Sequence, residues 1–284
     1  SGESVTNWVG YLSPRTYTLL LPGEGEKTLT LRLRNSNGSV SAPAAVAVYL
    51  DQTPPVIDSI LLAGGADYTG SLSPSLTIGS HYDSATGIGG YALSASSLVP
   101  AAWNETAPTA ASLAADDGTK TVYLHVRDKA GNSAFASDSI ILDRTPPGVA
   151  VGDITTTGNP GWVRNDQTVT VNFSVTEGGS GLHGAPSVTI AGQPATLSGT
   201  FPEYSARHDF SGTSIPQGPV GYTIDASDLA GNPMTQVSAS TGITYDREAP
   251  GVSIGSPSPA YATNATDVSY IVTYDADAAV TLAK

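Results

Sequence analysis

Residues 118–147 read GTKTVYLHVRDKAGNSAFASDSIILDRTPP, and their pattern is that of a β-hairpin. Apolar and polar side chains alternate along the first half: Val122, Leu124 and Val126 against Tyr123, His125 and Arg127. Alternation with a period of two is typical of an antiparallel strand that covers a core with one face. In the following turn, Asp128 can accept hydrogen bonds from the backbone ahead of it and Gly131 can adopt a positive φ. The stretch therefore predicts a strand, a tight turn and a second strand that ends at Asp143.

Two further segments, 25–55 and 218–250, repeat this pattern. Each has an alternating strand, an Asp or Asn turn with glycine, another strand, and an aspartate that precedes proline. The closing aspartates are Asp51, Asp143 and Asp246, spaced by 92 and 103 residues, which is the size of one β-sandwich domain. Two further runs alternate in the same way: Leu29, Leu31 and Leu33; Val169, Val171, Phe173 and Val175. We therefore predict an all-β chain of antiparallel β-sandwiches in tandem.

The prolines that follow the closing aspartates predict the domain boundaries. Proline cannot donate to a β-ladder and stiffens a linker, so these junctions favour domains arranged as a rod. The predicted domains are 1–51 (the C-terminal half of a sandwich), 52–143, 144–246, and 247–284 (the first strands of another).

Composition excludes several classes of function. The 284 residues carry a net charge of −13, with 12 Lys and Arg against 25 Asp and Glu. So few basic residues argue against binding to nucleic acid or to an anionic membrane surface. No apolar run reaches the 18 residues of a membrane-spanning helix, so membrane insertion is not expected. Cysteine is absent, which excludes thiolate metal sites and cysteine nucleophiles.

The junctions DQTPP (51–55) and DRTPP (143–147) and the turns VRDKAGN (126–132) and SDLAGN (227–232) carry a family resemblance. The chain resembles the tandem bacterial immunoglobulin-like repeats of large secreted and cell-surface, adhesin-type proteins. The resemblance implies immunoglobulin-like sandwiches, an extracellular or cell-surface location, and a structural or adhesive function as a stalk, spacer or interaction module. The first copy departs from the pattern, since Asn35 replaces the turn aspartate.

No arrangement of residues predicts catalysis. The four histidines lie at unrelated positions of the repeat and are expected at the surface: His81, His125, His183 and His208. No nucleophile elbow, phosphate loop or zinc motif is present. We therefore expect the chain not to be an enzyme.

Acidic residues predict calcium sites beside the linkers. In an immunoglobulin-like sandwich, the B–C and F–G loops lie at one pole, next to the incoming linker. These poles would gather three sets: Asp51, Asp83 and Asp128, with Asp58 as an addition; Asp143, Glu177 and Asp228; Asp246, Asp275 and Asp277. Carboxylates from separate loops, completed by carbonyl oxygens, suit Ca²⁺. The alternative is that each acid only caps its own turn and holds no metal.

The tryptophans divide into two groups. Trp8 and Trp103 fall at roughly the same repeat position, which favours packing in the core. Trp162 lies in the loop sequence GNPGW (158–162), where an exposed indole is a candidate ligand surface.

Three functions follow from this reasoning. The first is a structural or adhesive segment whose partners are neighbouring domains of the same or an adjacent chain. The second is a subunit of an extracellular filament or sheath, in which the strands of 247–284 complete the 1–51 half-domain of the next chain. The third is a module that uses Trp162 and loop tyrosines to bind a glycan or a cell-surface protein.

Overall fold

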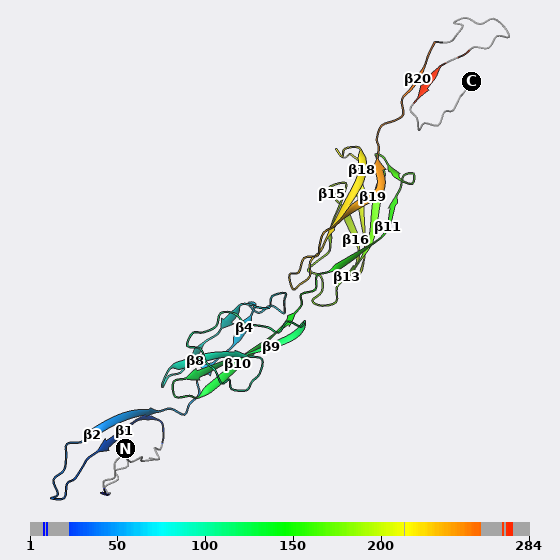
Figure 1. Cartoon of the computed structure of the whole chain (residues 1–284). Helices are drawn as coiled ribbons and strands as arrows, with labels where there is room; N and C mark the ends of the chain where they lie inside the picture. The colour runs from blue at the N-terminus through cyan, green and yellow to red at the C-terminus, as the bar shows by residue number, and fades with distance from the viewer. Residues whose placement is uncertain are drawn as a thin grey trace, which may run out of the picture. The chain divides into compact units, whose positions relative to one another are not determined.

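The computed structural model describes Trp8, Gly10, residues 23–212 and 214–256, Ser269 and residues 271–274. All regular elements in this part of the chain are β-strands (Figure 1). The prediction of an all-β fold is therefore confirmed.

The chain divides into two compact units. The first contains Ser1–Pro146 together with two loops that come from later in the sequence, Glu177–His183 and Ser227–Asn232. The second contains Pro147–Thr176, Gly184–Ala226 and Pro233–Lys284. Since the arrangement of one unit against the other is not defined, the rod and the bounds of the four predicted domains stay predictions.

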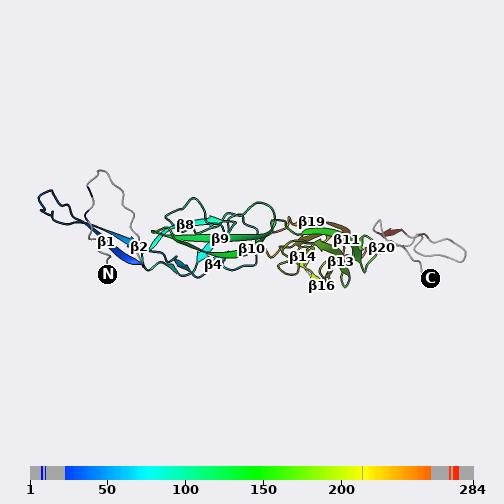
Figure 2. The same cartoon turned by 90° about the horizontal axis from the view of Figure 1, so that it is seen from below.

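The first unit contains a hairpin, a four-stranded sheet and two short strand pairs. The hairpin pairs β1 (Gly25–Leu31) with β2 (Ala44–Leu50). The sheet has the order β5 (Tyr68–Thr69), β10 (Ser133–Leu142), β9 (Gly118–Asp128), β8 (Ile88–Ser94). The pairs are β3 (Val56–Ile57) with β7 (His81–Tyr82), and β4 (Ile60–Leu62) with β6 (Leu76–Ile78). Figures 1 and 2 both show β9 and β10 side by side, as their antiparallel pairing requires.

The core of the first unit lies between the four-stranded sheet and the β4–β6 pair. Its buried side chains come from both layers and from the segment between β8 and β9: Ile60, Leu62, Leu76, Ala111, Leu113, Val122, Leu124, Val126, Ile140 and Leu142. The predicted inward face of the 122–127 run is therefore confirmed. The same expectation is wrong for the 25–34 strand: Leu29, Leu31 and Leu33 are 47%, 55% and 56% exposed, because β1 and β2 form a two-stranded sheet without a second layer among the described residues.

The second unit is a sandwich of two larger sheets with a short strand pair. The first sheet has the order β11 (Gly148–Thr156), β13 (Thr168–Thr176), β17 (Glu203–Asp209), β16 (Thr196–Thr200). The second has the order β12 (Trp162–Val163), β19 (Val237–Tyr245), β18 (Gly218–Asp225), β14 (Ser187–Ile190), β15 (Gln193–Pro194). The strand pair consists of β20 (Val252–Ile254) and β21 (Val272–Tyr274).

Alternation along β13 and β18 supplies the core of this sandwich. The buried apolar residues of these two strands occupy every second position: Val169, Val171, Phe173 and Val175; Val220, Tyr222 and Ile224. The strand predicted from the 169–175 run is thus confirmed, with its apolar face turned toward the other sheet.

The expectation that all four histidines lie at the surface is wrong for His125. Its side chain is 1% exposed, although it points away from the face that holds Leu124 and Val126. The Nε2 atom lies 3.0 Å from the carbonyl oxygen of Ser96 and 3.2 Å from Oγ of Ser94. A covering segment and these hydrogen bonds therefore bury a polar residue on what the sequence presents as an outer face.

The expectation that Trp8 and Trp103 pack in the core is also wrong. Trp8 is 46% exposed, and Trp103 is only partly buried. Each indole instead lies against a guanidinium group, Arg34 at 4.5 Å and Arg127 at 4.8 Å from the ring centroid. Both pairs are cation–π contacts, which also explains why tryptophan recurs at this position.

No helix within the described residues is long and apolar enough to span a membrane.

Candidate functional site

Three acids from separate parts of the first unit lie together beside the linker that follows β2. One carboxylate oxygen from each of Asp51, Asp83 and Asp128 lies within 4.8 Å of the other two. Asp51 directly follows β2, Asp83 directly follows β7, and Asp128 ends β9. Asp51 and Asp128 are buried, at 6% and 1% exposed. We call these three residues the Asp51 cluster.

A second set, the Asp143 cluster, has the same construction. Its members are Asp143, Glu177 and Asp228, and their carboxylate oxygens also lie within 4.8 Å of one another. Asp143 and Asp228 are buried, at 3% and 1% exposed. All three belong to the first compact unit, because the loops that carry Glu177 and Asp228 group with it.

The turn sequences position Asp128 and Asp228. Oδ1 of Asp128 accepts hydrogen bonds from the backbone N–H groups of Gly131 (2.6 Å) and Asn132 (2.9 Å). Gly131 has a φ of 105°, which a residue with a side chain rarely adopts. In the second copy, Asn232 donates its backbone N–H to Oδ1 of Asp228 at 2.7 Å. The predicted turn mechanism is therefore confirmed in both copies.

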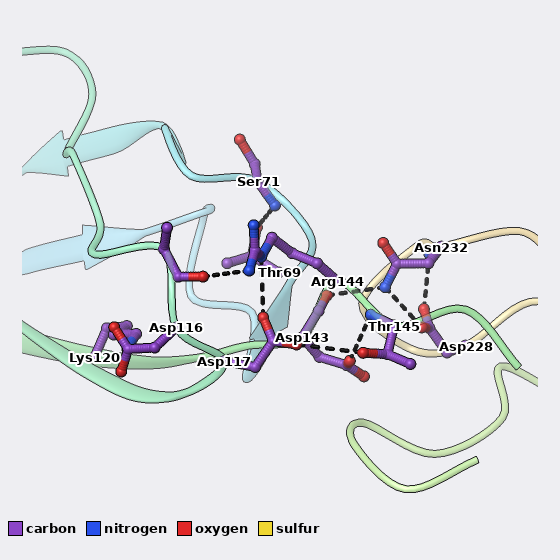
Figure 3. A network of polar contacts seen from close by, with 11 residues as sticks. Thr69, Ser71, Asp116, Asp117, Lys120, Asp143, Arg144, Thr145, Asp228 and Asn232 are labelled. Atoms are coloured by element: carbon purple, nitrogen blue, oxygen red, sulfur yellow. Dashed lines mark hydrogen bonds and ion pairs between the residues drawn. The ribbon is translucent and has the colours of Figure 1, made fainter.

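The asparagine of each turn fixes the linker in front of it. The side-chain amide of Asn132 donates to Oδ2 of Asp128 (2.8 Å) and to the carbonyl oxygen of Asp51 (3.1 Å). Asn232 repeats this with Oδ2 of Asp228 (2.7 Å) and the carbonyl oxygen of Asp143 (2.8 Å), as Figure 3 shows. One amide thus holds two members of each cluster together.

The third acid of each cluster has an oxygen that no donor occupies. All hydrogen bonds to the carboxylate of Asp83 go to Oδ1, from the N–H groups of 85–87 and from the hydroxyl of Thr86. Glu177 accepts one bond, from Gly179 to Oε1 at 2.7 Å. Within the described residues, Oδ2 of Asp83 and Oε2 of Glu177 therefore remain available to a ligand.

Thr86 and Ser180 are members of the site that the sequence reasoning missed. The hydroxyl of Thr86 donates to Oδ2 of Asp51 at 2.7 Å, and the backbone N–H of Ser180 donates to Oδ2 of Asp143 at 2.7 Å. Each lies three residues after the loop acid of its cluster. This shared spacing is the sequence feature that could have identified them.

Hydrogen bonds hold two of the acids in the charged form. Donation from the backbone N–H of Thr86, supported by Gly87, lowers the pKa of Asp83 below its ordinary value. Burial raises the pKa of Asp143, but hydrogen bonds from Ser180 and Thr145 outweigh this effect and the net pKa is lowered. Both clusters therefore carry concentrated negative charge at neutral pH.

No basic side chain neutralises this charge among the described residues. The ion pairs there involve other acids: Asp116 with Lys120, Asp117 with Arg144, and Asp209 with Arg207. Like charges this close repel unless a cation lies between them. The atoms available as metal ligands are carboxylate oxygens, without any imidazole or thiolate. Such a set fits a hard cation such as Ca²⁺ and does not favour zinc. Three protein carboxylates leave the other positions of a six- to eight-coordinate ion to carbonyl oxygens and water.

A second set of hydrogen bonds joins each linker to the acid that precedes the hairpin. Arg144 donates Nε to Oδ1 of Asp117 at 3.0 Å (Figure 3). Its guanidinium also contacts the carbonyl oxygen of Ala115. At the equivalent position of the first copy, Oε1 of Glu24 accepts from Thr53 Oγ1 (2.8 Å). The two accepting acids, Glu24 and Asp117, each directly precede the glycine that starts the hairpin of their copy. The linkers after Asp51 and Asp143 are therefore fixed on two sides.

Four predicted ligands are not placed in a described cluster. Asp58 lies outside the Asp51 cluster and is exposed. Asp246 is also exposed and accepts a hydrogen bond from the N–H of Glu248 at 3.0 Å. Asp275 and Asp277 lie outside the described residues.

Trp162, the predicted ligand surface, is 51% exposed. It lies at the start of β12 and not in an irregular loop.

No family model matches the sequence, and no curated protein shows a significant match. Among solved structures, fibronectin(III)-like modules of Clostridium thermocellum CbhA superpose with a TM-score of 0.40 at 12% identity, over 66% of this chain and 94% of that one. A Ca²⁺-stabilized, ice-binding adhesin of an Antarctic bacterium gives 0.39 at 18%, over 82% of this chain and 60% of that one. A tetra-tandem repeat from the extending region of a large adhesion protein gives 0.30 at 15%, over 88% and 70%. Similarity at this level does not extend to function.

Proposed function

We propose that this chain is a non-enzymatic structural or adhesive segment of an extracellular bacterial surface protein, and that calcium organises its linkers. The observation that carries the proposal is the duplicated acidic cluster. Two copies of the repeat each bring one linker acid and two loop acids within 4.8 Å, without a basic partner in the described residues.

The position of the clusters gives the cation its role. Asp51 and Asp143 belong to the linkers, whereas the other two acids of each cluster belong to loops at the ends of strands. A bound Ca²⁺ would therefore join a linker to two loops and restrict the freedom of the linker. A segment that presents another domain at a distance needs such restriction, because a linker free to bend shortens its reach.

The turn-capping alternative makes a different prediction. If Asp128 and Asp228 only cap their turns, the hydrogen bonds from Asn132 and Asn232 already complete their function. In that case, the repulsion among the acids would be offset only by hydrogen bonds such as those that Asp83 and Glu177 accept from their own turns. Calcium would then leave the stability of the protein unchanged, whereas loss of a calcium ligand would reduce a response to calcium.

The first experiment is a thermal melt of the full chain after treatment with EDTA, and again with added CaCl₂. A ligand that binds only the folded state stabilises it by RT ln(1 + [L]/Kd), about 2.7 kcal/mol at a concentration of 100 Kd. We expect calcium to raise the melting temperature by several degrees. Identical melting curves in EDTA and calcium would refute the calcium proposal.

Variants assign the effect to the clusters. Asp83→Asn and Glu177→Gln each remove one charge from the half-exposed acid of a cluster and leave the buried acids in place. Asp153→Asn is the matched control, because Asp153 is an exposed acid of β11 outside both clusters. We expect the double variant Asp83→Asn/Glu177→Gln to lose most of the calcium shift and the control to keep it.

Assembly by complementation remains an alternative that no described contact favours. Much of the segment it needs, residues 257–268 and 275–284, lies outside the described residues. Negative-stain electron microscopy of the full chain tests it, since regular filaments are expected only if strands of one chain complete the next.

A further inference from the structure

We propose that the surface around Trp162 binds a neutral saccharide. This site is separate from both acidic clusters, because it lies in the second compact unit and shares no residue with them. The proposal rests on an exposed indole and on a polar depression lined by residues that flank Trp162 in the chain.

The Trp162 side chain points outward from a fixed backbone. Val163, its neighbour in β12, is 1% exposed, so alternation along the strand turns the 51% exposed indole toward solvent. The backbone N–H of Trp162 donates to the carbonyl oxygen of Asn159 at 2.9 Å, and the two residues of β12 pair with β19. A large aromatic surface on a held backbone loses little conformational entropy when a ligand binds.

Trp162 is the only exposed large hydrophobic side chain between residues 136 and 200. A stable interface with a protein buries more than about 1,000 Å², with aromatic and apolar groups at its centre. A single exposed aromatic group on a stretch with no other large exposed apolar side chain instead matches a sugar ring, which presents an apolar C–H face to the indole and hydroxyl groups at its edge.

The residues that follow Trp162 supply polar groups for such hydroxyls. An open depression of about 540 Å³ is lined by Thr157, Arg164, Asn165, Asp166 and Gln167. Its wall is a closed turn, since Gln167 donates its N–H to the carbonyl oxygen of Arg164 (3.2 Å) and accepts the N–H of Arg164 on its side chain (3.0 Å).

Several of these groups keep free hydrogen-bonding capacity. Asn165 accepts from the hydroxyl of Tyr245 on Oδ1 at 2.5 Å, which leaves its NH₂ group as a donor. Asp166 accepts from Ser211 on Oδ1 at 3.2 Å, which leaves Oδ2 as an acceptor. The guanidinium of Arg164 forms no ion pair within the described residues. Planar groups of this kind can each contact two adjacent hydroxyls.

The charges favour a neutral ligand. Arg164 and Asp166 line the same depression with opposite charges, and the whole chain carries −13. The negative charge of the chain would repel an acidic saccharide, whereas it would not repel a neutral one. Asp166 also has a φ of 65°, a left-handed conformation that costs energy for a residue other than glycine and is more frequent at binding sites.

The test measures binding of the full chain to a panel of neutral gluco-, manno-, galacto- and N-acetylglucosamine oligosaccharides. The readout is the NMR signal of the indole N–H of Trp162, assigned by comparison with the Trp162→Phe variant. We expect at least one saccharide to shift this signal in a saturable manner, equally in EDTA and in calcium. If no saccharide shifts the signal, the proposal is wrong, even if a protein is found to bind at this surface.

Variants separate stacking from hydrogen bonding. We expect Trp162→Ala to weaken binding at least 10-fold, Trp162→Phe to weaken it less, and Arg164→Ala to weaken it 3- to 10-fold. Trp8→Ala is the control and should bind like the unaltered chain, since Trp8 lies in the other unit. Saccharide binding that survives Trp162→Ala in a chain with unchanged melting would also overturn the proposal.

Discussion

The side-chain amide nitrogen of Asn232 lies 2.8 Å from the carbonyl oxygen of Asp143 and 2.7 Å from Oδ2 of Asp228. These partners are 89 and 4 residues away in the sequence, so one amide joins a linker to a turn that is distant along the chain. Asn132 makes the same two contacts with Asp51 and Asp128. The asparagine that ends each turn therefore positions the acids of each cluster before any cation binds.

Removal of this amide should destabilise the first compact unit. Asn232→Ala leaves a partly buried carbonyl oxygen and a carboxylate oxygen without their donor, which costs about 1–3 kcal/mol. We expect the melting temperature of that unit, measured by differential scanning calorimetry, to fall by several degrees. Asn172→Ala is the matched control, because its amide makes one exposed bond to the carbonyl oxygen of Asp153 and its loss should cost little. Equal effects of the two variants would contradict the assigned role.

Two neighbouring glycines provide a test of packing at the Asp143 cluster. A Cβ built on Gly179 would overlap the carboxylate of Asp143, whereas one built on Gly178 meets nothing within 4 Å. Neither residue has a positive φ, so alanine is compatible with both backbones. We expect Gly179→Ala to lower stability by about 1–3 kcal/mol and to reduce the calcium shift, because the carboxylate must move. Gly178→Ala should do neither. Melts with and without calcium compare the pair, and a normal calcium response in Gly179→Ala would show that Asp143 is not a ligand.

Strands and turns were predictable because their causes are local. The alternation in 122–126 and 169–175 places apolar groups on one face, and a strand is the conformation that buries that face. The turns need only an aspartate and a glycine at fixed spacing, and the structure shows the bonds from Gly131 and Asn132 to Asp128. Repetition of the unit then indicated which loops meet at each linker.

Other features depend on contacts that no local pattern encodes. Burial of His125 results from Ser94 and Ser96, which precede it by about 30 residues. The position of Trp103 depends on Arg127, the outward residue of a neighbouring strand. The roles of Thr86 and Ser180 appear only when the two clusters are compared. Polar residues whose partners are distant are therefore the part of a β-sandwich that its sequence indicates least.

Acid should destabilise the protein below about pH 4. The pKa of Asp83 is lowered from 3.8 by hydrogen bonds, led by that from the N–H of Thr86. The pKa of Asp143 is also lowered, since bonds from Ser180 and Thr145 outweigh its burial. A depressed carboxyl pKa adds stability above the unfolded value, about 3.9, and this stability is lost as pH falls through the folded value. We expect constant melting temperatures from pH 7 to 5 in EDTA and a decline below pH 4, measured by circular dichroism. A rise in stability between pH 5 and 3 would mean that repulsion among the acids exceeds their hydrogen bonding.

A histidine in the second unit should be replaceable with a gain in stability. The Nε2 atom of His208 is buried and has no hydrogen-bond partner among the described residues, and its ring packs edge-on against Phe210 at 5.1 Å. A buried polar atom without a partner costs about 1–3 kcal/mol, which an apolar side chain of similar size avoids. We expect His208→Leu to raise the stability of the second unit by about 1 kcal/mol in urea unfolding. His183→Leu replaces an exposed histidine and should change stability by less than about 0.5 kcal/mol. If His208→Leu is instead the more destabilising of the two, Nε2 has a partner such as a buried water, and its hydrogen bond contributes to the fold.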